Sequence, residues 1–118
     1  MESEETIISL SALAQSTRLE VFRLLVTHEP HGLAAGDIAR ELAVPQNTMS
    51  SHLAILSRAG LIASVRTGRS ITYRANLAQL QNVVLFMLKD CCGGKTEICA
   101  PLIESLAPCL PKRKKANA

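Results

Sequence analysis

The sequence has 118 residues, of which 47% are hydrophobic, 3% aromatic and 19% charged, and its formal net charge is +3. This length fits one folded domain, and the apolar fraction excludes a chain that is disordered throughout. The sequence contains no apolar run of about 20 residues that could span a membrane, and its acidic start differs from the basic leader of a signal peptide, so we expect a soluble cytoplasmic protein with no membrane partner.

The first four predicted elements are helices. Apolar residues at near-helical spacing predict a helix from Glu5 to Ala14, and Ser16 is expected to cap a second helix that ends at the turn over residues 30–32. A third helix over Ala34 to Leu42 and a fourth from Gln46 to about Arg58 are separated by three residues, which is the helix-turn-helix arrangement. The fourth helix is expected to bury four apolar side chains, Met49, Leu53, Ile55 and Leu56.

A β-hairpin and a last helix follow. The β-branched segments Leu61–Arg66 and Arg69–Arg74 flank a turn at Thr67–Gly68. Asn76 is expected to cap a helix from Leu77 to about Asp90. The expected order is therefore α-α-α-α-β-β-α, which is a mainly helical winged helix-turn-helix with a small β-hairpin.

The last helix is apolar on every side between Val83 and Leu88. A helix at the surface of a monomer needs only one apolar stripe, and a domain of this size has little interior in which to bury more. The last helix and the first are therefore predicted to form a dimer interface. The alternative is a core helix buried in a monomer.

Basic residues are concentrated in the middle of the chain. Acids gather at the N-terminus and Lys112–Lys115 forms a basic run near the other end, so both ends resemble solvated tails. The segment from Val44 to Arg74 contains no acid and four arginines, Arg58, Arg66, Arg69 and Arg74. This local charge favours contact with a polyanion such as DNA.

The second helix of a helix-turn-helix enters the major groove of DNA, where short polar side chains contact base edges and phosphates. Gln46 and Asn47 have the amide geometry for adenine edges, whereas Thr48, Ser50 and Ser51 suit phosphate or sugar contacts. The alternative interpretations involve no DNA: the start of the fourth helix is then an ordinary polar face, the histidine lies at the surface, and the arginines are only solvated. The predicted DNA-binding residues are Gln46, Asn47, Thr48, Ser50, Ser51, His52 and, on either side of the hairpin turn, Arg66 and Arg69.

Four cysteines follow the last apolar segment. The cytosol keeps thiols reduced, so metal binding or redox chemistry is favoured over disulfides. Cys91 and Cys92 adjoin Gly93–Gly94, which can unwind the helix so that both thiols face one centre, and Cys99 can fold back as a third ligand. Three thiolates without histidine suit a soft, thiophilic ion, and Cys109 is a candidate fourth ligand. The alternative is a set of inert buried thiols.

Several segments resemble the ArsR/SmtB family of metalloregulatory repressors, over about Ile7 to Leu88. They are Leu13-Ala14-Gln15-Ser16-Thr17-Arg18-Leu19, Ile38-Ala39-Arg40-Glu41-Leu42, and Thr48-Met49-Ser50-Ser51-His52-Leu53-Ala54-Ile55-Leu56 followed by Ala59-Gly60-Leu61-Ile62. The resemblance implies a homodimeric winged-helix repressor, not an enzyme, that binds double-stranded operator DNA and releases it when an inducer ion binds. It implies no organic cofactor.

The resemblance also indicates which ion is the inducer. Arsenic sensors of the family often carry a Cys-x-Cys pair beside the recognition helix, but Glu41–Pro45 has no cysteine. Its zinc sensors use Asp and His along the last helix, and Leu77–Lys89 has neither. A vicinal cysteine pair with a third cysteine nearby is similar to other arsenite-responsive members. This similarity implies Cys91, Cys92 and Cys99 as ligands of As(III), with Sb(III) as a further inducer.

Other hypotheses stay open from the sequence. Cd(II) and Pb(II) also favour thiolates, and a thiol redox switch on DNA would use the same residues. A cytosolic thiol metal chaperone or redox enzyme would need no DNA, but it leaves the acid-free segment unexplained. We expect residues 1–90 to form the DNA-binding and dimerisation domain, and residues 91–118 to form a cysteine-containing segment with a basic tail.

Overall fold

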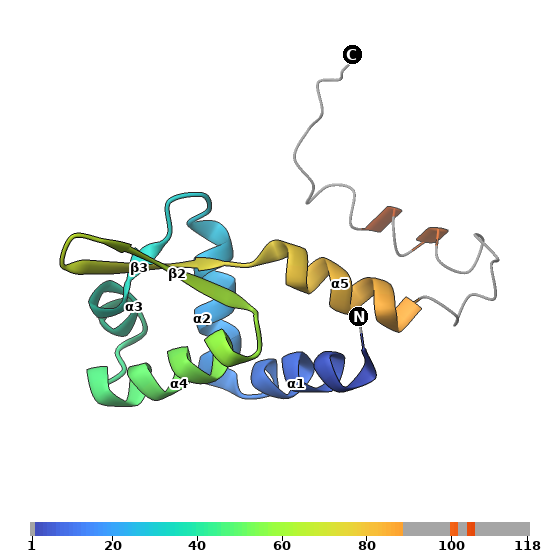
Figure 1. The fold of residues 1–118 in the computed structure, drawn as a ribbon, viewed down its shortest axis with the longest axis horizontal. Helices are drawn as coiled ribbons and strands as arrows, with labels where there is room; N and C mark the ends of the chain where they lie inside the picture. The colour runs from blue at the N-terminus through green and yellow to red at the C-terminus, as the bar shows by residue number, and fades with distance from the viewer. Residues whose placement is uncertain (1, 89–99, 102–103, 106–118) are drawn as a thin grey trace, which may run out of the picture. The chain divides into compact units, whose positions relative to one another are not determined.

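The fold was obtained as a computed structural model, which describes residues 2–88, 100–101 and 104–105. Residues up to Phe86 form one compact unit, in which the hairpin of a small antiparallel sheet projects beyond the helices (Figure 1). This architecture confirms the predicted winged helix-turn-helix. Its elements are α1 (Ser3–Leu13), α2 (Ser16–Thr27), β1 (Leu33–Ala34), α3 (Ala35–Leu42), α4 (Gln46–Arg58), β2 (Ile62–Thr67), β3 (Ser70–Ala75) and α5 (Leu77–Leu88).

The sheet has one strand more than the sequence predicts. Its order is β1-β3-β2, with antiparallel pairing throughout, and β1 pairs Leu33 with Tyr73 and Ala34 with Thr72. The two residues of β1 are too few to show the apolar alternation by which a strand is recognised. The predicted start of the third helix at Ala34 was therefore wrong by one residue, because Ala34 belongs to the strand.

The hairpin turn lies one residue later than predicted. Thr67 pairs with Ser70, which leaves Gly68 and Arg69 as the two turn residues. Gly68 has a φ of +61°, a conformation that favours glycine, and it is the first of the two turn residues rather than the second. Arg69 is consequently at the tip of the hairpin and not in its second strand.

Two helix starts also differ from the prediction. The acidic N-terminus is not a solvated tail up to Glu5, because α1 begins at Ser3 and places Glu4 and Glu5 in its first turn. The carboxylate of Glu5 accepts a hydrogen bond from the backbone N–H of Glu2 at 3.2 Å, and acids at this end complement the helix dipole. The cap of α2 is Gln15 rather than Ser16, since the Gln15 side chain accepts the backbone N–H of Arg18 at 2.8 Å.

The core is aliphatic and lies among α2, α3, α4 and the base of the hairpin. Leu25, Ile38, Leu56 and Leu61 are completely buried. Each such side chain contributes about 1.5–3 kcal/mol to folding. Of the four residues expected to be buried on α4, Met49, Leu53 and Leu56 are buried, whereas Ile55 is only partly buried.

Helix α1 turns its polar and small residues inward. Thr6, Ser9 and Ala12 are buried, whereas the side chains of Ile7 and Ile8 are 61% and 52% exposed. In α5, Val83 is buried and Leu85 is 55% exposed. The alternative of a last helix buried in the core of a monomer is therefore not observed over Leu77–Phe86.

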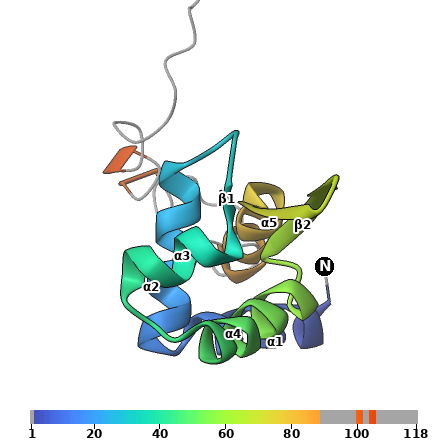
Figure 2. The same cartoon turned by 90° about the vertical axis from the view of Figure 1, so that its left-hand side faces the viewer.

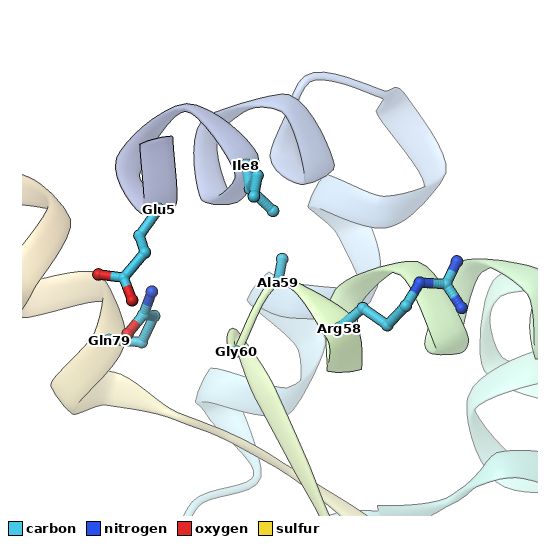
Figure 3. A pocket seen from close by; sticks show the side chains of 6 residues that line it. All are labelled: Glu5, Ile8, Arg58, Ala59, Gly60 and Gln79. Carbon is cyan, nitrogen blue, oxygen red and sulfur yellow. The ribbon is translucent and has the colours of Figure 1, made fainter. Parts of the chain in front are cut away.

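A group of polar contacts explains why α1 is turned this way. The Ser9 hydroxyl donates to the Ala59 carbonyl at 3.1 Å, and Gln79 Nε2 donates to Ser9 Oγ at 3.0 Å. Asn76 Nδ2 donates to the Gly60 carbonyl at 2.9 Å. These five residues, which we call the α1–α4–α5 junction, join three helices at the end of α4. Figure 3 shows the Gln79 and Glu5 side chains pointing toward one another at one side of a hollow of about 220 Å³, which Ala59 and Gly60 also line.

Replacing Ser9 with alanine tests this junction. S9A leaves the Ala59 carbonyl and the Gln79 amide without their partner in a buried position, so we expect a loss of about 1–3 kcal/mol of unfolding free energy. Urea unfolding at one fixed protein concentration measures it. Ser11 is an exposed serine of the same helix, and S11A should stay within about 0.5 kcal/mol of wild type. Equal stability of S9A and S11A would contradict the role given to Ser9.

Candidate nucleic-acid interface

The turn between α3 and α4 fixes how the second helix is presented. Ala43 has a φ of +55°, and the N–H of Val44 donates to the Ala39 carbonyl at 3.0 Å, which ends α3. Pro45 precedes α4, where a residue without an N–H loses no helical hydrogen bond. The two helices pack against each other, and Figure 2 shows α4 below the sheet and α3 to its left.

Burial of one side of α4 exposes the other. Met49, Leu53 and Leu56 recur at helical spacing and enter the core. The predicted DNA-binding residues of the first two turns lie on the remaining surface, and the side chains of Gln46, Asn47, Thr48, Ser50 and Ser51 are all exposed. The structure thus brings these five together as a polar, uncharged surface, which we call the α4 face.

Asn47 is partly committed within the protein. Its Oδ1 accepts the backbone N–H of Thr48 at 2.9 Å, in the first turn of α4 where backbone N–H groups have no helical partner. One lone pair of Oδ1 is therefore already engaged within the protein, while the second lone pair and the NH2 group stay available to an adenine edge.

His52 is half-buried rather than fully exposed. Its Nδ1 is buried and has no hydrogen-bond partner among the residues that the structure describes. With Nδ1 enclosed in the protein, Nε2 is the ring nitrogen that can contact a ligand.

The hairpin carries two exposed arginines beyond α4. Arg66 lies in β2 opposite Ile71, and Arg69 occupies the turn. The fourth arginine of the acid-free segment behaves differently, because Arg74 contacts the Glu29 carboxylate at 2.8 Å and 3.3 Å. The predicted local charge of four is therefore an overestimate. Glu29, which lies outside that segment in the sequence, offsets the charge of Arg74. The charges of Arg58, Arg66 and Arg69 remain as the positive charge of the segment.

The predicted metal ligands Cys91, Cys92 and Cys99, and also Cys109, lie outside the described residues. Within residues 2–88, 100–101 and 104–105, no three His, Cys, Asp or Glu side chains come together as a metal site. None of the helices in these same ranges has the length and apolar character needed to cross a bilayer.

Comparison with known proteins identifies the family. A family model described as a helix-turn-helix domain matches residues 13–65. The transcriptional repressor SdpR of Bacillus subtilis is 34% identical over 87 residues, which are 74% of this chain and 93% of the repressor. An ArsR-like transcriptional regulator from Rhodococcus sp. RHA1 has a similar structure, with a TM-score of 0.66 and 28% identity over 88% of this chain and 93% of that one. The chain belongs to the ArsR family of winged helix-turn-helix transcriptional regulators.

Membership of this family agrees with the prediction of a DNA-binding regulator rather than an enzyme. A further solved structure is that of a possible transcriptional regulator for arsenical resistance. It has a TM-score of 0.55 and is 28% identical, and the match covers 64% of this chain and 79% of that one.

The contact between Glu29 and Arg74 predicts a pH-dependent stability. The hydrogen bond from Arg74 lowers the pKa of Glu29 below its ordinary value of 4.5. The pair therefore stabilises the fold above about pH 4.5, and this contribution disappears as the pH falls through the lowered pKa. E29Q should be less stable than wild type at neutral pH, and the difference should shrink in acid.

Thermal unfolding of wild type and E29Q between neutral pH and pH about 3 measures this difference. Glu41 is an exposed acid of α3, and E41Q serves as the matched control with little pH-dependent change. A gap between wild type and E29Q that stays constant over the whole range would contradict the pairing.

Proposed function

We propose that this chain represses transcription as a homodimer that binds operator DNA and releases it when As(III) or Sb(III) binds Cys91, Cys92 and Cys99. In this proposal residues 1–90 carry DNA binding and dimerisation, and residues 91–118 carry the inducer site. The observation that carries the DNA-binding part is the exposed α4 face, which lies in a stretch of 31 residues from Val44 to Arg74 without an acid.

Each side chain has a role that suits its chemistry. Gln46, with Asn47, contacts base edges, and the hydroxyls of Thr48, Ser50 and Ser51 bind phosphate or sugar. His52 contacts the backbone of the DNA through Nε2. Arg66 and Arg69 reach phosphates beside the groove, because the hairpin follows α4 directly in the fold.

The exposed apolar side chains of α1 and α5 support the homodimer. Ile7 and Ile8 on α1 and Leu85 on α5 are more than half exposed, whereas the aliphatic side chains of the core are buried. Pairing two copies through these helices removes this surface from water. The dimer also presents two α4 helices, which can read two half-sites about 34–36 Å apart.

The cysteine spacing supports the choice of inducer. Arsenite, As(OH)3, exchanges its hydroxyl groups for thiolates, so that each As–S bond formed releases one water from an S–H and an As–OH. Three thiolates complete a pyramidal As(III) site without a fourth ligand, and they suit a soft ion. The structural similarity to a possible regulator of arsenical resistance is in keeping with this choice.

The junction offers a route from the inducer site to the DNA. The proposed ligands follow α5 in the chain, and the first turn of α5 contacts the end of α4 through Gln79, Ser9 and Ala59. Asn76 makes a second contact, because its backbone N–H donates to the Leu61 carbonyl at 2.8 Å. A shift of α5 on ion binding would change the position of α4 and of its partner in the dimer. A coupling of about 1–3 kcal/mol is enough for regulation.

The hairpin arginines predict a change in salt dependence. Each cation that contacts a phosphate adds about one to the slope of log affinity against log salt, so the R66A/R69A double variant should lower the slope by about two. Fluorescence anisotropy with a labelled duplex of random sequence, over a series of salt concentrations, measures this slope. R23A, which removes an exposed arginine of α2, should leave it unchanged. An unaltered slope in the double variant would exclude the hairpin from the interface.

The inducer is tested by release of DNA. We expect arsenite to dissociate wild-type protein from a duplex that the same protein has enriched from a randomised library, at one fixed salt concentration. C92S should remain bound, because it leaves only two of the three thiolates, whereas C109S should respond as wild type does.

The proposed inducer would be excluded if arsenite left the wild-type complex with DNA intact, or if C92S released DNA as fully as wild type does. Release by cadmium or lead but not arsenite would favour the alternative of a different thiophilic ion. Absence of any salt-dependent DNA binding would favour the thiol chaperone instead.

A further inference from the structure

Gly36 lies against the side chain of Gln46. Gly36 is the second residue of α3, and Gln46 is the first residue of α4. A Cβ atom added to Gly36 would lie 3.0 Å from Gln46 Nε2, whereas the next nearest atom, Arg40 Nη1, would be 3.8 Å away. A methyl group at position 36 would therefore push the Gln46 amide a few tenths of an ångström away from α3.

This contact restricts an otherwise free side chain. Gln46 is exposed at the start of α4, and a glutamine there can adopt many rotamers. Ordering such a side chain on binding is opposed by the loss of rotamer entropy. A side chain that already rests on the neighbouring helix has lost part of that freedom before DNA arrives.

Gln46 also differs from Asn47 in having its whole side-chain amide uncommitted. Asn47 Oδ1 accepts the N–H of Thr48, whereas the Gln46 amide makes no hydrogen bond within the part of the chain that the structure describes. Both its oxygen and its NH2 group remain for the edge of one adenine, which presents one donor and one acceptor in the major groove. Of the two amides on the α4 face, Gln46 is thus the one whose amide gives up no internal hydrogen bond in a two-point contact.

We propose that Gly36 is a specificity-determining position, which acts by seating the Gln46 amide where it reads a base pair. Gly36 touches no DNA in this proposal and is a positioning residue. The inference rests on the proposed function, because it takes the α4 face as the surface that reads the operator.

The G36A variant separates positioning from folding. The atom that its methyl group meets is the far end of a flexible side chain, so the fold can accommodate the change. Alanine also favours a helix more than glycine does, and the thermal unfolding midpoint of G36A should be equal to or above that of wild type. The Gln46 side-chain amide signals in a ¹H–¹⁵N NMR spectrum should shift, which a neutral substitution would not cause.

The decisive measurement is base discrimination in a double-mutant cycle. The probes are the duplex that wild type enriches from a randomised library and the set of its single base-pair variants, at one salt concentration. We expect Q46A to lose about 5- to 150-fold discrimination at one position in each half-site. G36A should lose discrimination at the same position and nowhere else, with unchanged affinity for random DNA, and G36A/Q46A should equal Q46A.

Two outcomes would overturn the inference in distinguishable ways. If Q46A loses discrimination and G36A retains it, Gly36 does not seat Gln46, although the proposed function stands. If Q46A discriminates as wild type does at every position, Gln46 reads no base and the inference fails, whereas the salt dependence and the release by arsenite still test the proposed function. A loss in G36A that persists in the Q46A background would show that Gly36 acts through some other group.

Discussion

The Ser9 hydroxyl is the contact on which the arrangement of the helices depends. It donates to the Ala59 carbonyl and accepts from Gln79, in a position with no exposure to solvent. A buried hydroxyl without partners would destabilise the fold by about 1–3 kcal/mol, so α1 is held in the one rotation that satisfies it. That rotation turns Ile7 and Ile8 outward.

The same contact links two surfaces with different functions. The exposed apolar side chains of α1 and α5 form the surface that we assign to a second copy, and the α4 face is the surface that we assign to DNA. Ala59 and Gly60 follow α4 directly, and both carbonyls accept hydrogen bonds from side chains of α1 or of the segment that begins α5. A regulator whose DNA affinity responds to a change at α5 needs such a connection, because coupling requires contacts that differ between two states.

The sequence predicts the features that depend on local periodicity or composition. The helices, the hairpin and the exposed polar start of α4 can be predicted because their signal is the spacing of apolar and polar residues only a few positions apart. Three other features depend on contacts between different elements of the fold, which local spacing does not reveal. They are the strand β1, the pairing of Arg74 with Glu29 and the contact of Gln46 with Gly36. Ser9 gives a faint signal, as a serine between Ile8 and Leu10, but nothing nearby identifies Gln79 as its partner.

We infer that the junction couples the inducer to the DNA, and the effect of arsenite on the DNA affinity of Q79A measures this coupling. The coupling factor is the ratio of dissociation constants for the enriched duplex with and without arsenite. We predict that Q79A retains as much protein-bound arsenic as wild type after gel filtration but has a markedly smaller coupling factor. Q81A, an exposed glutamine of the same helix, should keep the full factor. Full coupling in Q79A would contradict the account.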